Sequence, residues 1–148
     1  MNKKVAILGK LPTKFKAPFH DLDYDIWAFN WHEDVNKIPR VTIWFDIHSC
    51  GFNPNAKITR SNFPFTECEN LLGGQYFNNT VSYLIAYAIL EGYREIELYG
   101  MRFNSGSEIR NAEYHNVREL IFFAKGSGIS ITAPYDSIML KEYPLYGI

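Results

Sequence analysis

A carboxylate and an imidazole, those of Asp46 and His48, stand close together at the end of an apolar segment. In an extended chain, residues two apart point to the same face, so we expect these two side chains to lie side by side. A carboxylate can orient an imidazole for general acid–base chemistry. Asp46 and His48 are therefore candidate catalytic residues, with a hydrogen-bonding role in the fold and contact with a ligand as the alternatives.

Metal chemistry is not indicated by the remaining histidines and cysteines. His20, His32 and His115 show no ligand spacing, and Cys50 and Cys68 form no Cys-x-x-Cys pair. We expect no metal and no cofactor, and two free thiols in a reducing compartment.

A second polar group follows the Gly/Ser-containing segment 104–107. It holds Glu113 and Tyr114 as candidate ligand contacts and His115 as a further candidate base. Charged residues at a helix start usually face solvent, but this segment could instead close over a ligand. The chain lacks the Gly-x-Ser-x-Gly and His-Glu-x-x-His motifs of hydrolases and metalloproteases.

The turn after the first apolar segment is the main candidate for ligand binding. The segment 4–9 ends at Gly9 and continues into Lys10, Pro12 and Thr13. This turn is neither the Gly-x-Gly-x-x-Gly fingerprint nor a Walker loop. A glycine at a strand end lets backbone approach a ligand, and Thr13 could hold a phosphate; a plain strand-ending turn is the alternative.

A cap-like sequence precedes the clearest helix. Asn79 or Thr80 supplies the oxygen that caps it. The same helix start is an anion site if it points at a ligand, so both residues are candidate ligand contacts.

Apolar patterns predict the elements that position these residues. Buried strands are expected at 4–9, 24–30, 40–48, 95–100 and 129–132, and helices at 80–91, 111–125 and, at the C-terminal end, 136–143. In the third strand Val41, Ile43, Phe45 and Ile47 are expected on one face. The segment 49–75 has no clear period, apart from an irregular strand within 58–66.

Strands that alternate with amphipathic helices predict one α/β domain over residues 1–148. We expect a Rossmann-like, doubly wound and mainly parallel sheet of five strands, with helices on both faces. The order 3-2-1-4-5 puts Leu8 beside Leu98, and ligands bind where such an order reverses. Residues 9–13 and 100–104, including Gly100 and Arg102, should therefore wall a crevice.

The composition of the chain indicates which kinds of partner it can bind. The net charge of −1 predicts no affinity for nucleic acid or for an anionic membrane. No segment has the length of a signal peptide or a membrane span, so a cytoplasmic location is expected. Aromatic residues make up 16% of the chain, which indicates a thick core, a ring-stacking site, or, if exposed, a homo-oligomer or another assembly partner.

The chain also resembles known families in three places. These are Gly9 with Pro12-Thr13, then Asn30, and then the block that runs from Asn79 through Gly92-Tyr93-Arg94-Glu95-Ile96 to Gly100. Bacterial sialyltransferases of the Campylobacter type and pterin pyrophosphokinase-like families share a strand ending in Gly-x-x-Pro-Ser/Thr, an asparagine and such a block. Small proteins of tailed bacteriophages look similar in the 44–48 strand and at Glu113-Tyr114.

The resemblance implies a nucleotide or nucleotide-sugar ligand held by Gly9, Pro12, Thr13 and Asn30. Arg102 stands where the sialyltransferases usually have an aspartate, and its guanidinium suits a phosphate. A nucleotide-dependent transferase of glycosyl or pyrophosphoryl groups, of phage or bacterial origin, is therefore the leading hypothesis. The alternative is a non-catalytic protein that sequesters a nucleotide or nucleotide second messenger, as in phage anti-defence.

Overall fold

Six parallel strands form one sheet in the computed structural model, which describes residues 2–48, 51, 53–75, 77–101, 108–135 and 146–147. The strands are β1 (Lys3–Leu8), β2 (Tyr24–Phe29), β3 (Ile43–Asp46), β4 (Ile58–Thr59), β5 (Tyr93–Tyr99) and β6 (Ser130–Thr132). Their order is β4-β3-β2-β1-β5-β6, so the order predicted for the five longer strands is confirmed. The sixth strand, β4, extends the sheet beyond β3.

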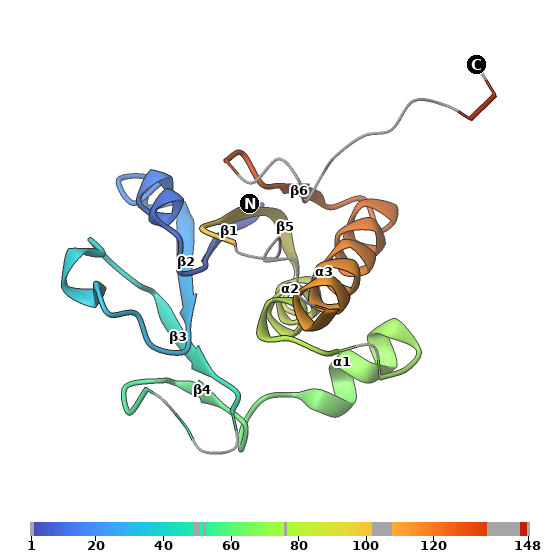
Figure 1. Cartoon of the computed structure of the whole chain (residues 1–148), viewed down its shortest axis with the longest axis horizontal. Coiled ribbons are helices and arrows are strands. Elements are labelled where there is room, and N and C mark those ends of the chain that lie inside the picture. The colour runs from blue at the N-terminus through green and yellow to red at the C-terminus, as the bar shows by residue number, and fades with distance from the viewer. Residues whose placement is uncertain are drawn as a thin grey trace.

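The central strand β1 is buried on both faces, as its continuous apolar run predicts. Val5, Ala6, Ile7 and Leu8 have no exposed surface. The strand pairs with β2 on one side and β5 on the other, and Leu8 pairs with Tyr99 rather than with the predicted Leu98. The sheet therefore reverses its order at β1 and β5, and the carboxyl ends of these strands meet there (Figure 1).

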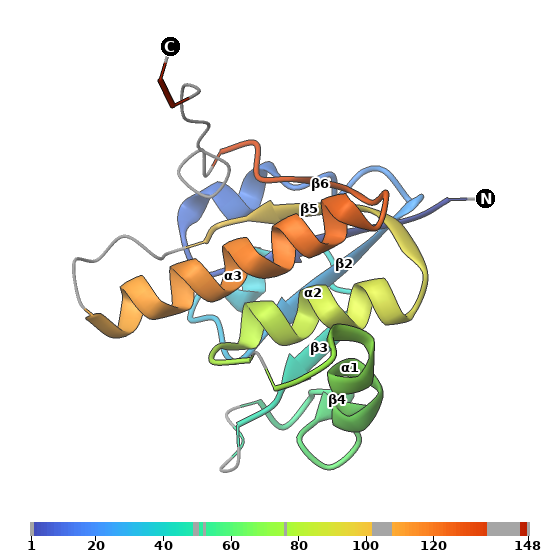
Figure 2. The same ribbon diagram turned by 90° about the vertical axis from the view of Figure 1, so that its right-hand side faces the viewer.

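Among the described residues, three α-helices cover one face of the sheet (Figures 1 and 2). They are α1 (Phe65–Leu72), α2 (Thr80–Leu90) and α3 (Glu108–Gly126). The apolar face predicted for α2 is confirmed, because Val81, Leu84, Ile85 and Ala88 are buried against Val5 and other sheet residues. At about 25 cal/mol per Å² of apolar area, such burial is the main source of stability for this layer.

Shorter elements cover the opposite face. The 3-10 helices η1 (Pro12–Lys16) and η2 (Val35–Lys37) are each followed by a residue that packs on this face, Ala17 and Ile38 respectively. They contact the sheet through Ala6, Leu8 and Ile26. Helices thus lie on both faces of the described fold, which is α/β and Rossmann-like as predicted, with 3-10 helices on the face opposite α1, α2 and α3.

The strand β3 is shorter than predicted, and the expected position of Val41 was wrong. Val41 packs with Trp44 on the η1 and η2 face, whereas Ile43 packs on the helical face. Just before β3, Thr42 bonds twice to Ile26 of β2: the Thr42 N–H donates to the Ile26 carbonyl at 2.7 Å, and the Thr42 hydroxyl accepts from the Ile26 N–H at 2.9 Å. The regular pairing of β2 with β3 begins at Ile43.

The segment 49–75 contains α1 and β4 in its described part. The helix α1 begins after Pro64 and ends at Gly73, whose φ of 77° is the left-handed conformation of a helix end. It buries only Cys68, a free thiol, and burial raises the pKa of this thiol to about 11.

Cys50 and the helix predicted at 136–143 lie outside the described residues. No described helix is long and apolar enough to cross a membrane.

Candidate functional site

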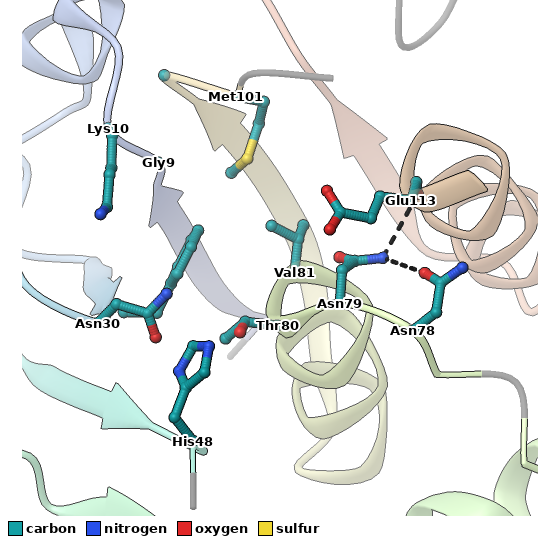
Figure 3. A pocket seen from close by; sticks show the side chains of 12 residues that line it. Gly9, Lys10, Asn30, His48, Asn78, Asn79, Thr80, Val81, Met101 and Glu113 are labelled. Atoms are coloured by element: carbon teal, nitrogen blue, oxygen red, sulfur yellow. Dashed lines mark hydrogen bonds between the residues drawn. The ribbon is translucent and has the colours of Figure 1, made fainter. Parts of the chain in front are cut away.

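A cavity of about 500 Å³ opens at the carboxyl ends of β1, β2 and β5 (Figure 3). Its volume lies in the range of small-molecule sites. The start of α2 and one residue of α3 complete it. The lining residues are Gly9, Lys10, Phe29, Asn30, His48, Asn78, Asn79, Thr80, Val81, Gly100, Met101 and Glu113. The cavity therefore sits where the strand order predicted a ligand crevice.

Glycine is required at positions 9 and 100 because the two backbones contact each other closely. A Cβ on Gly9 would lie 2.2 Å from the carbonyl oxygen of Gly100, and Gly100 itself has a φ of 69°. The Gly9 N–H donates to the Tyr99 carbonyl at 2.7 Å, and the Leu11 N–H donates to the Gly100 carbonyl at 3.0 Å. The glycine that suggested a ligand-binding turn is thus explained by close packing of two backbones.

Thr13 holds this contact in place. Its hydroxyl accepts a hydrogen bond from the Gly100 N–H at 3.1 Å. Thr13 and Pro12 belong to η1 and are not among the residues that line the cavity, whereas Lys10 lines it. The part of the turn that faces the cavity is therefore Gly9 and Lys10.

Asn30 directly follows β2 and has the left-handed conformation, with a φ of 60°, which asparagine tolerates better than most residues. Its N–H donates to the Phe45 carbonyl at 2.8 Å, and its carbonyl accepts from the Asn53 side chain at 3.2 Å. The side-chain oxygen, Oδ1, is buried and has no hydrogen-bond partner in the described structure. The backbone of Asn30 is thus fully used, while its side chain faces the cavity with an unused acceptor (Figure 3).

Asp46 and His48 lie close together, as predicted. The Nδ1 atom of His48 is 3.5 Å from Oδ1 of Asp46. Asp46 is buried and also accepts hydrogen bonds from the backbone N–H groups of Asn53, at 2.6 Å, and of His48, at 3.4 Å. The carboxylate therefore fixes the chain beyond β3, and only His48 of the pair lines the cavity.

His48 also borders a second cavity of about 270 Å³. This cavity lies at the ends of β3 and β4, and its lining residues are Asp46, His48, Gly51, Asn53, Thr59, Arg60 and Ser61. One imidazole, 43% exposed, is thus shared by two cavities. That position suits a group that acts between two bound molecules.

The start of α2 is fastened to α3. Asn79 is the N-cap predicted from the sequence, and its Oδ1 accepts from the Ser82 N–H at 3.1 Å. The side chain of buried Asn116 accepts from Asn78 and from Asn79, each at 3.2 Å. The first turn of α2, with Thr80 and Val81, is therefore held against the cavity with its N–H groups at that end of the helix (Figure 3).

Of the three candidates on α3, one lines the cavity. Glu113 lines the cavity, and its side chain points into it (Figure 3). Tyr114 is not a lining residue; its hydroxyl accepts from Arg118 at 3.2 Å and its ring packs on the helical core. His115 is exposed and does not line the cavity. Arg102 lies outside the described residues.

Sequence reasoning missed several residues of the site. Phe29 and Val81 line the cavity but were not predicted, and Asn53 and Asn116 hold its walls. Met101, which also lines it, lies in the predicted wall 100–104. Phe29 and Val81 are sequence neighbours of the candidates Asn30 and Thr80, so they could have been found by extending each candidate segment by one residue. The two asparagines stand in no motif, and only the fold brings them to the site.

Among the described residues, no group of three or more His, Cys, Asp and Glu side chains could hold a metal ion.

Comparison with known proteins points to one fold. No family model matches the chain, and neither does any curated protein. The structure is similar to that of the sialyltransferase CstII from Campylobacter jejuni in complex with the substrate analogue CMP-3FNeuAc. The TM-score is 0.55 at 17% identity, over 93% of this chain and 82% of that one. What the two share is the fold.

A second structure of the sialyltransferase CST-II, with a trisaccharide acceptor and CMP, gives a TM-score of 0.51 at 17% identity, over 93% of this chain and 83% of that one. The expected likeness to Campylobacter sialyltransferases is confirmed at the level of the fold. The likenesses to pterin pyrophosphokinase-like families and to phage proteins, and a phage origin, stay predictions.

Proposed function

We propose that the larger cavity binds a nucleotide and that the chain transfers a glycosyl group from a nucleotide-linked donor. The observation that carries the proposal is the position of the cavity, at the strand ends where the sheet order reverses and against the first turn of α2. This is where open α/β sheets bind nucleotides. The fold shared with a sialyltransferase studied with CMP and a CMP-sugar analogue supports the choice of ligand.

The lining residues divide by chemistry in a way that suits a nucleotide. The Lys10 ammonium and the N-terminal N–H groups of α2 favour a phosphate, because both present positive charge or partial charge. The Glu113 carboxylate can accept hydrogen bonds from ribose or sugar hydroxyls. The side-chain oxygen of Asn30, Oδ1, has no hydrogen-bond partner among the described residues and can accept from an N–H donor of the ligand.

His48 is the proposed general base. It lines both cavities, so a donor in the larger one and an acceptor hydroxyl in the smaller one would meet at its ring. Asp46, 3.5 Å from Nδ1, would orient the ring and stabilise its protonated form, so Asp46 is a positioning residue. The hydroxyl proton goes to the imidazole while the oxygen forms the new glycosidic bond and the nucleotide leaves with the electrons of the broken one.

Binding can be tested with CMP and, for selectivity, with UMP, AMP and GMP. We expect CMP to raise the melting temperature in a dose-dependent way, because a ligand of the native state stabilises it. The Lys10→Ala variant should lose most of this shift. The Lys16→Ala variant is the matched control, because Lys16 is an exposed lysine of the neighbouring η1 that does not line the cavity. No shift with any of the four nucleotides would overturn the proposal.

Turnover is tested separately, with CMP-linked and UDP-linked sugars and chromatographic detection of the released nucleotide. Release that requires an added hydroxyl acceptor is the expected result. Saturable binding with no release from any of these donors would contradict the transferase and leave the sequestering protein as the function.

A further inference from the structure

A buried charged cluster lies on the loops that carry two walls of the larger cavity. The Lys14 side chain is 2% exposed. Its Nζ is 2.5 Å from Oδ1 of Asp34, 3.0 Å from Nδ1 of His32 and 3.3 Å from the carbonyl oxygen of Lys10. An ammonium has three N–H donors, so these three acceptors satisfy it completely.

The hydrogen bond between Lys14 and His32 determines which ring nitrogen of His32 carries the proton. An ammonium cannot accept a hydrogen bond, so Nδ1 of His32 accepts and the ring proton of the neutral imidazole sits on Nε2. Burial, and then the charge of Lys14, lower the pKa of His32 to about 4. The same ammonium lowers the pKa of Asp34 below its usual range. At neutral pH the cluster therefore contains one cation, one carboxylate and one neutral ring.

The three partners of Lys14 come from two different loops. Lys10 follows β1 and lines the cavity, whereas His32 and Asp34 follow β2, just beyond the cavity residue Asn30. The β1–β2 pairing ends at Leu8 and Ala28. Beyond that point Lys14 continues the link between the two loops.

We propose that Lys14 is a positioning residue that holds the Lys10 wall and the Asn30 wall of the cavity together. The link replaces the ladder bonds that the strands no longer make. The buried ammonium can hold it because Lys14 and His32 are shielded from water and the Asp34 side chain is only 33% exposed. Its effect on a ligand rests on the proposed function, whereas its effect on the two loops does not.

Amide hydrogen exchange tests the link without any ligand. In Lys14→Met we expect at least about tenfold faster exchange of the amides of Leu11, Asn30 and Val35, with the β5 amides unchanged. Lys16→Met, on the same 3-10 helix but exposed, should leave all of them unchanged. If Lys14→Met does not fold, Asp34→Asn keeps the ammonium and should speed the same amides by about threefold. Unchanged exchange at these amides in a folded variant would overturn the proposal.

Two further readouts separate positioning from general loss of structure. In Lys14→Met the pKa of His32, followed by NMR titration, should rise from about 4, whereas Lys16→Met should keep it there. The affinity for CMP should fall about tenfold in Lys14→Met and stay unchanged in Lys16→Met. Faster exchange with unchanged CMP affinity would overturn the positioning role. If the unaltered protein does not bind CMP, that result counts against the proposed function, and the link is decided by exchange alone.

Discussion

Two walls of the larger cavity are built differently. One, the glycine wall (Gly9, Lys10, Gly100 and Met101), is set by backbone meeting backbone at the ends of β1 and β5. The other, the polar wall (Asn30 and His48), is held by hydrogen bonds of the buried Asp46 and Asn53 side chains behind it, at the ends of β2 and β3. Gly9, which stands out in the sequence, is therefore required for close backbone packing. The side chains of Asn30 and His48, which line the cavity, belong to segments without a known motif. Substitutions in each wall test separately whether its residues serve packing or contact with a ligand.

The largest effect is expected from Gly9→Ala. The added Cβ would meet the Gly100 carbonyl oxygen at 2.2 Å, and neither backbone can move without breaking the β1–β5 contact. We expect the free energy of unfolding to fall by about 3 kcal/mol, measured by urea denaturation. Gly126→Ala, where a Cβ meets nothing within 4 Å, is the control and should be neutral or stabilising. A Gly9→Ala protein of normal stability would show that the glycine wall is not tightly packed.

A pH dependence is expected on the polar side, at His32 in the loop after β2. Its pKa of about 4 in the fold, against 6.5 ordinarily, means that the unfolded chain binds more protons in this window. Stability is therefore complete above pH 6.5 and falls as the pH drops toward 4, by about 3 kcal/mol.

The measurement is the free energy of unfolding at several pH values, in the unaltered protein and in His32→Gln. The variant lacks the imidazole and should lose less stability over the same interval, while the other titrating groups act alike in both. Parallel curves would mean that His32 is not held neutral by the fold.

A smaller effect is expected from Asp46→Asn, which keeps the shape of the side chain but removes its charge. The Asn53 N–H, at 2.6 Å, loses a charged acceptor. We expect a loss of about 1–2 kcal/mol in the free energy of unfolding. Asp23→Asn, on the exposed loop before β2, is the control and should change stability by less than about 0.5 kcal/mol. Equal stabilities of the two variants would show that Asp46 does not hold the polar wall.

The smallest effect on stability is expected from His48→Gln, since the imidazole is 43% exposed. The change should be less than about 0.5 kcal/mol. Under the proposed function, the rate of transfer should nevertheless fall by about 10²–10⁴. Undiminished turnover in this variant would remove His48 from the chemistry.

The order of the sheet was predictable because long apolar runs at 4–9, 24–30 and 95–100 have few ways to be buried. The position of the cavity followed from that order. The helix α2 was also predictable, since a capping asparagine and Gly92 bracket a regular apolar face. These features depend on local pattern and on chain connectivity.

The remaining features depend on contacts between distant residues. The helix α1 packs Phe65, Cys68 and Leu72 against the core, but it spans only eight residues, too few for this spacing to predict a helix on its own. The role of Thr13 depends on Gly100, far away in the chain, and Asn116 contacts Asn79 from another helix. The burial of Lys14 depends on acceptors in two loops, and a lysine in a basic stretch otherwise indicates an exposed surface.

The most direct measurement is a titration of the ¹⁵N-labelled protein with CMP, followed by the backbone amide signals. We expect saturable shifts at Gly9, Lys10, Asn30, Thr80, Val81 and Gly100, with none at the outer surface of α3 around Phe122. Absence of saturable shifts, or shifts centred away from the cavity, would contradict the central claim that this cavity binds a nucleotide.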